Sequence, residues 1–280
     1  RRSWAPARAP TAGPALAPVV AAPPSSQDPP VQLLAAHGWC GQADSWQPWI
    51  NATSPLGWQW ICQERGYDGR PPRTAQWQPP ADAHRVVIGH SFGPHLVEPT
   101  VLAAADAVVL LASFARFLPP GREGRRLQTA LAGMAAQLEE PHDNHPDDRA
   151  DPTGADRAQA MLRQFLVQAA LPDPPELMPL GPAAAPVPAA GRRRLLRDLR
   201  ALEASAGLPA GFPAAVPVLI VEAGADQIVG PAARALLREA LPQAEVLEMT
   251  GAGHAFLRAA VVPAVVTWLQ RTLAAMPPRR

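Results

Sequence analysis

The 280-residue chain contains no lysine at all, because every one of its 25 basic side chains is an arginine. A lysine Schiff base and the lysine of a phosphate-binding P-loop are therefore excluded. Cysteine is also scarce, and two thiols cannot build a disulfide framework or a cysteine-based zinc cluster. No apolar run reaches the roughly 18 residues that a membrane span needs, so we expect no membrane partner.

Charge of either sign is low. Charged residues make up 18% of the chain, and the 24 acidic side chains nearly cancel the arginines to leave a net charge of +1. A nucleic-acid-binding protein normally carries a broad positive excess, so we expect no nucleic-acid partner. The histidines lack ligand spacing with cysteine or carboxylate side chains, and we expect neither a metal nor any other cofactor.

What the chain does contain is apolar residues, at 48%, and 36 prolines. The apolar content predicts a sizeable core, and the many prolines favour short elements over a helical bundle. Residues 1–30 are rich in Pro and Ala without a hydrophobic period, which predicts a disordered tail. Pro14 and Pro18 interrupt the apolar stretch that a signal peptide would need, so we expect a cytoplasmic protein. We also expect a monomer. Free thiols are then favoured over a disulfide between Cys40 and Cys62, although that pairing stays open.

Short apolar runs bounded by turn residues predict buried strands at 31–36, 58–62, 85–89, 107–112, 216–221 and 245–247. Helical patterns lie between several of them, which predicts an α/β protein with a mostly parallel sheet covered on both faces. The alternation stops over residues 114–215, where three helical stripes and many prolines predict an inserted helical lid with a mobile acidic loop at 139–156. Residues 31–113 and 216–276 then form the core domain.

The sharpest motif is the pentapeptide GHSFG between Gly89 and Gly93, directly after an apolar strand. A strand-to-helix turn of this kind needs both glycines and exposes Ser91 at the carboxyl edge of the sheet. Asp226 and His254 follow the last two predicted strands. The pattern predicts a triad in which Ser91 is the nucleophile, His254 the base and Asp226 the residue that orients the ring. The alternatives are a helix N-cap for Asp226 and an ordinary loop histidine for His254.

Two backbone N–H groups are candidates to hold the oxyanion that forms on a substrate carbonyl. Phe92 directly follows the nucleophile, and Trp39 lies after the first strand, where His37 and Gly38 turn the chain. Trp39 is also a large aromatic, and packing in the core is a role that it can fill at the same time. We assign no chemical role to His90.

Together these residues resemble the α/β-hydrolase family over about residues 31–275. More narrowly, the chain is similar to the pimeloyl-[acyl-carrier protein] methyl ester esterases of biotin synthesis. The similarity lies in HGW at 37–39 with Trp46 seven residues on, GYDG at 66–69, MLRQFL at 161–166 and RLLRDLR at 194–200. The resemblance implies the α/β-hydrolase fold, oxyanion donors at Trp39 and Phe92, and an acyl chain in contact with Trp39 and Phe165.

The chain also departs from that family. The second glycine of the motif is followed by Pro94 instead of Gly or Ala, and the second strand ends in QERG at 63–66 instead of Asp followed by Pro-Gly. The N-terminal hairpin common in the fold has no counterpart before Val31. Pro99 falls deeper in the segment after the motif, so the helix there should be short or kinked.

Three functions are compatible with these patterns. The first is a serine carboxylesterase that hydrolyses the methyl ester of pimeloyl-acyl-carrier protein. Its support is an arginine face opposite a leucine stripe in the lid, which would suit an acidic carrier but is equally explained as a solvated surface. The second is a general esterase for small free carboxylic esters, and the third a non-catalytic binding protein, which the complete triad disfavours. The docking residues of the first are Arg163, Arg193, Arg197 and Arg200.

Overall fold

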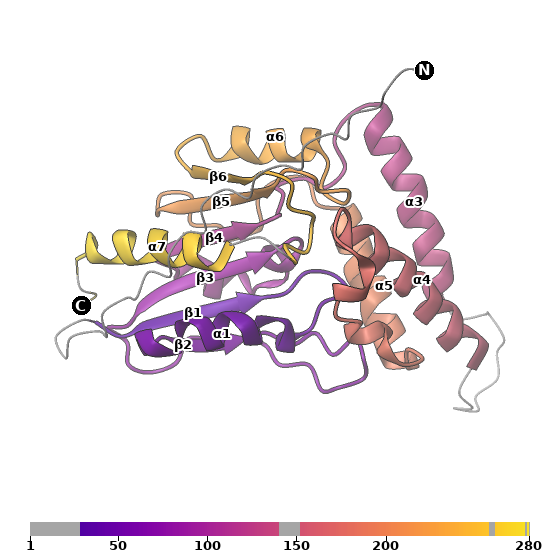
Figure 1. The fold of residues 1–280 in the computed structure, drawn as a ribbon, viewed down its shortest axis with the longest axis horizontal. Helices are drawn as coiled ribbons and strands as arrows, with labels where there is room; N and C mark the ends of the chain where they lie inside the picture. The colour runs from indigo at the N-terminus through magenta and orange to yellow at the C-terminus, as the bar shows by residue number, and fades with distance from the viewer. Residues whose placement is uncertain (1–28, 140–151, 258–260, 278, 280) are drawn as a thin grey trace, which may run out of the picture.

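The computed structural model describes residues 29–139, 152–257, 261–277 and 279, and its described strands form one parallel sheet. The six strands run in the order β2-β1-β3-β4-β5-β6 (Figure 1), and every neighbouring pair is parallel. Their carboxyl ends therefore meet at one edge. The sheet confirms the predicted α/β class. The strands are β1 Val31–Ala36, β2 Gln59–Cys62, β3 His84–His90, β4 Ala107–Leu111, β5 Val218–Ala223 and β6 Glu245–Met249.

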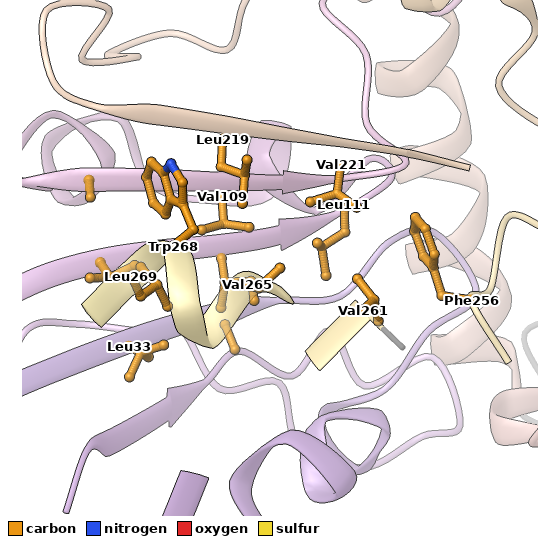
Figure 2. Packing of buried hydrophobic residues seen from close by; sticks show 14 of the residues in the cluster. Leu33, Val109, Leu111, Leu219, Val221, Phe256, Val261, Val265, Trp268 and Leu269 are labelled. Carbon is orange, nitrogen blue, oxygen red and sulfur yellow. The ribbon is translucent and has the colours of Figure 1, made fainter. Parts of the chain in front are cut away.

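Helices α1 (Gln47–Thr53) and α7 (Val261–Ala274) cover one face of the sheet. Side chains of a strand alternate between the two faces, so every second residue of the central strands faces these helices. Figure 2 shows Val265, Trp268 and Leu269 of α7 against this face. Burying a large apolar side chain contributes about 2 kcal/mol, which fixes the apolar stripe of α7 on the sheet. The strand partners are Leu33, Val109, Leu111, Leu219 and Val221.

Helices α2 (Pro99–Ala103) and α6 (Pro231–Ala240) cover the opposite face. The alternate strand residues, including Leu34, Val87 and Ile220, pack there. Because both faces are covered, the central strands are mostly apolar, which is why their runs are readable in the sequence. The short 3-10 helices of the core are η1 Ala43–Trp46, η2 Ser54–Leu56 and η3 Gly93–Leu96.

The segment predicted as a lid, residues 114–215 (the lid segment), carries α3 (Arg122–Leu138), α4 (Pro152–Ala170) and α5 (Ala189–Glu203). Figure 1 shows the three helices together beyond the carboxyl ends of the strands. Their apolar stripes form a separate core with residues from the sheet edge, among them Trp39 and Phe92. The lid segment thus packs over the edge where the predicted triad lies. Its 3-10 helices are η4 Pro175–Leu177 and η5 Gly181–Ala184.

Some predictions fall outside the described residues. These are the disordered tail, apart from residues 29 and 30, and residues 140–151 of the acidic loop. The loop prediction is wrong at residues 152–156, which lie in helix α4. None of the described helices is long and apolar enough to cross a membrane.

The helix after the GHSFG motif is broken, as its prolines predict. The turn η3 ends at Leu96, because Val97 is extended with ψ at 138°. Pro99 then begins the separate helix α2 at its first turn, where a missing N–H costs nothing. The result is a short turn in place of one long helix behind the predicted nucleophile.

Candidate active site

Ser91 occupies the sharp turn between β3 and η3, with φ at +54°. The N–H of Ser91 donates to the carbonyl of Leu111 at 2.8 Å, and the carbonyl of Ser91 accepts a hydrogen bond from Ser113 Oγ at 2.7 Å. A Cβ atom at Gly93 would lie 2.1 Å from the carbonyl oxygen of Ala36, so the second glycine of the motif is a steric requirement. A left-handed non-glycine residue held by its surroundings is typical of a functional position.

Asp226 and His254 follow β5 and β6 and are joined by a hydrogen bond. His254 Nδ1 lies 2.9 Å from Asp226 Oδ2, while Asp226 Oδ1 accepts the N–H groups of Ile228 at 2.7 Å and Val229 at 2.9 Å. Burial acts to raise the pKa of Asp226, but His254 and the hydrogen bonds outweigh it and lower the pKa. The ionised carboxylate holds the proton on Nδ1 and leaves Nε2 of His254 as the acceptor.

The N-cap alternative for Asp226 needs a correction at the helix boundary. Helix α6 begins at Pro231, not at Val229, and its N-cap residue is Gly230. Asp226 therefore caps the turn ahead of the helix with one oxygen while the other oxygen holds His254. The structural and the chemical interpretations of Asp226 are compatible.

His90, to which the sequence assigns no role, contacts the same site. Its Nε2 donates to the carbonyl of His254 at 2.9 Å, and the two rings lie 4.9 Å apart. Burial and the neighbouring His254 lower the pKa of His90 to about 4, so its ring is neutral at pH 7. No hydrogen bond joins Ser91 Oγ to His254 within the described residues, and such bonds often form only in the complex with substrate.

The loop of residues 37–41 (the 37–41 loop) packs directly against the turn that carries Ser91. A Cβ atom at Gly38 would lie 2.9 Å from Ser91 Cβ, and the Gly41 N–H donates to the Gly38 carbonyl at 3.0 Å. Trp39 and Phe92 are buried, and their backbone N–H groups donate no hydrogen bond to any described residue. Buried backbone donors are nearly always paired, so these two are suited to an external acceptor.

A cavity of about 460 Å³ opens beside His254 and His90. Trp39 forms one wall, and its ring meets Phe165 of α4 edge-on at 5.1 Å. The Trp39 side chain also packs in the core of the lid segment, so both roles considered for this residue are compatible with its position. The lining is largely apolar and carries no lysine or arginine; it includes Trp46, Trp49, Leu166, Ala169, Met178, Phe256, Val261 and Val262.

Cys40 lines this cavity, but neither cysteine of the chain is suited to act as a nucleophile. Both cysteines are free thiols. Burial raises the pKa of Cys40 to about 12 and that of Cys62 to about 11. Neither is a thiolate at neutral pH, so neither is an activated nucleophile.

Sequence reasoning misses a buried ionic cluster between the loop after β2 and helix α5. Arg65 donates to both carboxylate oxygens of Asp198, from Nε at 2.8 Å and from Nη2 at 2.7 Å. Tyr67 donates its hydroxyl to the same carboxylate at 2.8 Å. A signal is present, because two of the segments on which the resemblance rests, GYDG and RLLRDLR, are the two sides of this contact.

The predicted docking arginines lie on the lid segment but differ in their surroundings. Arg193, Arg197 and Arg200 are exposed on α5, opposite the buried leucine stripe, as their spacing predicts. Arg200 pairs with Glu139 at 2.9 Å. Arg163 is not on this face, because its Nε donates to the carbonyl of Ala183 in η5.

The parallel sheet, the turn that carries Ser91 and the site at the carboxyl edge define the α/β-hydrolase fold. No protein-family model and no curated protein matches the chain. Among solved structures, it is similar to an esterase from Exiguobacterium antarcticum (16% identity, TM-score 0.61, covering 87% of this chain and 93% of that one). It is also similar to the enol-lactonase from Burkholderia xenovorans LB400 (16%, TM-score 0.60, 89% and 94%). A third is an alpha/beta hydrolase fold protein from Burkholderia ambifaria (18%, TM-score 0.53, 88% and 91%).

Proposed function

We propose that the protein is a serine hydrolase of carboxylic esters. The observation that carries the proposal is the 2.9 Å hydrogen bond between Asp226 and His254 at the sheet edge where the nucleophile turn presents Ser91. A histidine oriented by a buried carboxylate is the base that a serine needs, because the hydroxyl is a weak nucleophile at neutral pH. The unpaired N–H groups of Trp39 and Phe92 supply the oxyanion donors.

In the proposed reaction, Ser91 Oγ attacks the ester carbonyl carbon while its proton passes to Nε2 of His254. The negative charge that forms on the carbonyl oxygen is held by the two N–H donors, and Asp226 stabilises the imidazolium. The tetrahedral intermediate collapses, the carbon–oxygen bond to the alcohol breaks, and His254 protonates the leaving alcohol. Water, deprotonated by His254, then attacks the acyl-serine. The bond between Ser91 Oγ and the acyl carbon breaks, His254 returns the proton to Oγ, and the carboxylic acid is released.

The cavity indicates the kind of ester. Its aromatic and aliphatic walls suit an uncharged apolar acyl or alcohol group, and no arginine among the lining residues is placed to pair with a free carboxylate. This supports hydrolysis of small free esters, as does the similarity to solved structures named as an esterase and an enol-lactonase.

The narrower proposal is hydrolysis of the methyl ester of pimeloyl-acyl-carrier protein. It is supported by the resemblance in the lid segment and by the exposed arginines of α5, which match the charge of an acidic carrier. The methyl ester would enter the cavity, while the carrier stays outside at the arginine face.

Labelling with a fluorophosphonate tests the broad proposal, with Ser91→Ala as the variant and Ser205→Ala as the matched serine control. We expect the label and the hydrolysis of p-nitrophenyl acetate to vanish in Ser91→Ala, with activity lower by about 10⁴-fold or more, and to persist in the control. Labelling that persists in Ser91→Ala would place the nucleophile elsewhere. No labelling of the wild type would favour the binding protein.

The narrower proposal is tested by growth without biotin of a bacterial strain that lacks its own pimeloyl-ester esterase. Rescue by the wild type and not by Ser91→Ala is the expected result. Activity on p-nitrophenyl acetate without rescue would favour the general esterase.

A further inference from the structure

Helix α5 of the lid segment holds the 37–41 loop by a direct contact. The indole Nε1 of Trp39 donates to the backbone carbonyl of Leu195 at 2.9 Å, and both residues are buried. Trp39 is also the residue whose backbone N–H is the proposed oxyanion donor. The direction of that N–H therefore depends on a side chain that is anchored to α5.

The same helix reaches the loop by a second route, which starts one turn later at Asp198. This carboxylate is 2% exposed and accepts the paired hydrogen bonds of Arg65 together with the hydroxyl of Tyr67. Burial and the charge of Asp198 raise the pKa of Tyr67, so its hydroxyl stays protonated and donates. Charge-assisted, two-pronged contacts of this kind are strong and fix the relative geometry of the groups that they join.

From Arg65 and Tyr67 the route returns to the 37–41 loop through His37. The backbone N–H of Arg65 donates to His37 Nε2 at 3.3 Å, and the ring of Tyr67 meets the His37 ring edge-on at 5.9 Å. Because Nε2 accepts, Nδ1 carries the proton, and it donates to the carbonyl of Gly38 at 2.9 Å. Burial lowers the pKa of His37, which is consistent with this neutral ring.

Glu64 completes the cluster on the other side of the loop. Its Oε2 accepts the N–H of Ala43 at 3.0 Å and its Oε1 accepts the N–H of Gly66 at 2.7 Å. The segment from His37 to Ala43 is thus held at both ends by residues of the QERGY stretch, 63–67. Within the cluster of Glu64, Arg65, Tyr67 and Asp198, it is Asp198 that belongs to the lid segment.

We propose that Asp198 is a positioning residue for the oxyanion site, acting through Arg65, Tyr67 and His37 on the Trp39 N–H. The inference rests on the proposed function, because it assigns a role within the same reaction. On this proposal the lid segment positions the oxyanion site for every ester substrate, whether or not a carrier docks on the exposed face of α5. The oxyanion forms in the transition state and is absent from the bound substrate. A residue that positions the oxyanion donor therefore affects kcat and leaves KM unchanged.

The test compares Asp198→Asn and Tyr67→Phe with Leu202→Ala, which removes buried apolar atoms from the same helix and takes part in none of the hydrogen bonds of the cluster. With p-nitrophenyl acetate we expect kcat to fall about tenfold or more in Asp198→Asn, since losing one oxyanion donor outright costs about 10²–10³-fold. KM should stay within about twofold. Affinity for a trifluoromethyl ketone, which forms an oxyanion on Ser91, should fall in parallel.

Leu202→Ala should lower the melting temperature at least as much but keep kcat and ketone affinity. Equal losses of kcat in Leu202→Ala would overturn the inference, because they would show a general effect of destabilising α5. Unchanged kcat and ketone affinity in Asp198→Asn would also overturn it. If Asp198→Asn does not fold, the test relies on Tyr67→Phe, which loses a single hydroxyl and keeps the ring against His37. A fall in its kcat and ketone affinity would support the inference, and unchanged values would overturn it.

Amide hydrogen exchange over residues 37–46 provides a readout that needs no activity. We expect faster exchange there in Asp198→Asn than in Leu202→Ala, and equal exchange would contradict the positioning role. A wild type that neither hydrolyses the ester nor binds the ketone would instead refute the proposed function, while the exchange data still decide whether Asp198 orders the loop.

Discussion

At the scale of single residues, Asp226 divides its two oxygens between two tasks. Oδ2 holds His254, and Oδ1 caps the turn at Ile228 and Val229. Asp226→Asn keeps an oxygen that accepts the N–H groups of the turn. It loses the negative charge, and its amide N–H faces Nδ1 of the histidine, which then has to accept a hydrogen bond instead of donating one. We expect the activity to fall by about 10⁴-fold, with the free energy of unfolding changed by less than about 1 kcal/mol.

Asp226→Ala is the matched comparison, because it removes both functions. It should lose comparable activity and a further 1–2 kcal/mol or so of stability, as the two N–H groups lose their partner. Urea unfolding and p-nitrophenyl acetate kinetics on both variants measure the two effects separately. If both variants unfold at the same urea concentration, the capping role is wrong.

His90 should make the fold sensitive to acid. Its pKa is about 4 in the folded chain and about 6.5 when exposed, so the unfolded state binds the proton first. Stability should therefore fall as the pH drops from about 6.5 towards 4, with a slope of up to about 1.4 kcal/mol per pH unit from this residue. His37 and His95, whose pKa values are also lowered by burial, act in the same direction.

His90→Gln keeps an N–H donor for the His254 carbonyl and removes the titrating ring. Urea unfolding at pH 7.5 and at pH 5 should show a smaller loss of stability on acidification in this variant than in the wild type. An unchanged loss would assign the acid sensitivity to other groups.

Residue-scale sequence reasoning is strongest where backbone geometry restricts the choice of residue. The GHSFG turn requires glycine against the Ala36 carbonyl, so the location of Ser91 is readable from the pentapeptide. The burial of Asp198 cannot be read from its local sequence, because its partner Arg65 lies far away in the chain. The resemblance marks the GYDG and RLLRDLR segments but not the contact between them. The role of His90 cannot be predicted for a similar reason. Its partner is the backbone carbonyl of His254, and a backbone carbonyl carries no sequence signal.

At the scale of elements, α3 contains two glycines that should respond in opposite ways. A Cβ atom at Gly133 meets nothing within 4 Å, whereas one at Gly124 would lie 1.9 Å from the carbonyl oxygen of Pro119. Gly133→Ala should stabilise the protein by about 0.5–1 kcal/mol, because alanine favours the helix and restricts the unfolded chain. Gly124→Ala should destabilise it, since helix α3 must move away from Pro119.

Thermal unfolding of the two variants gives this comparison directly. A destabilising Gly133→Ala would mean that α3 is not a regular helix at that point.

Element boundaries show which sequence signals dominate. The sequence places the strands to within about two residues. Burial on both faces makes the central strands short apolar runs, whereas the edge strand β6 is largely exposed and carries two glutamates. Helix α6 begins later than its apolar pattern suggests, as Pro231 sets its first turn. The α4 helix extends well ahead of the stripe that begins at Met161, because its first two turns carry few large apolar residues to mark them.

At the scale of the whole molecule, the arginine face of α5 allows a test of carrier docking. Charge reversal at Arg193, Arg197 and Arg200 should lower kcat/KM for a carrier-linked ester and leave p-nitrophenyl acetate nearly unaffected, because the site residues are unchanged. Exposed charges act mainly on the encounter rate, so the loss should shrink at high salt. Kinetics at two salt concentrations measure it. Loss on neither substrate would leave this face as ordinary solvated surface.

The register of β4 on β5 sets a constraint on how the chain folds. Val108 pairs with Val218, so these central strands can meet only after the whole lid segment has been looped out between them. Closing so long a loop costs entropy before any strand contact compensates for it, and such pairings form slowly. β1, β3 and β4 are nearer in sequence and can assemble first. In pulse-labelled refolding, amides of β5 and β6 should thus gain protection last.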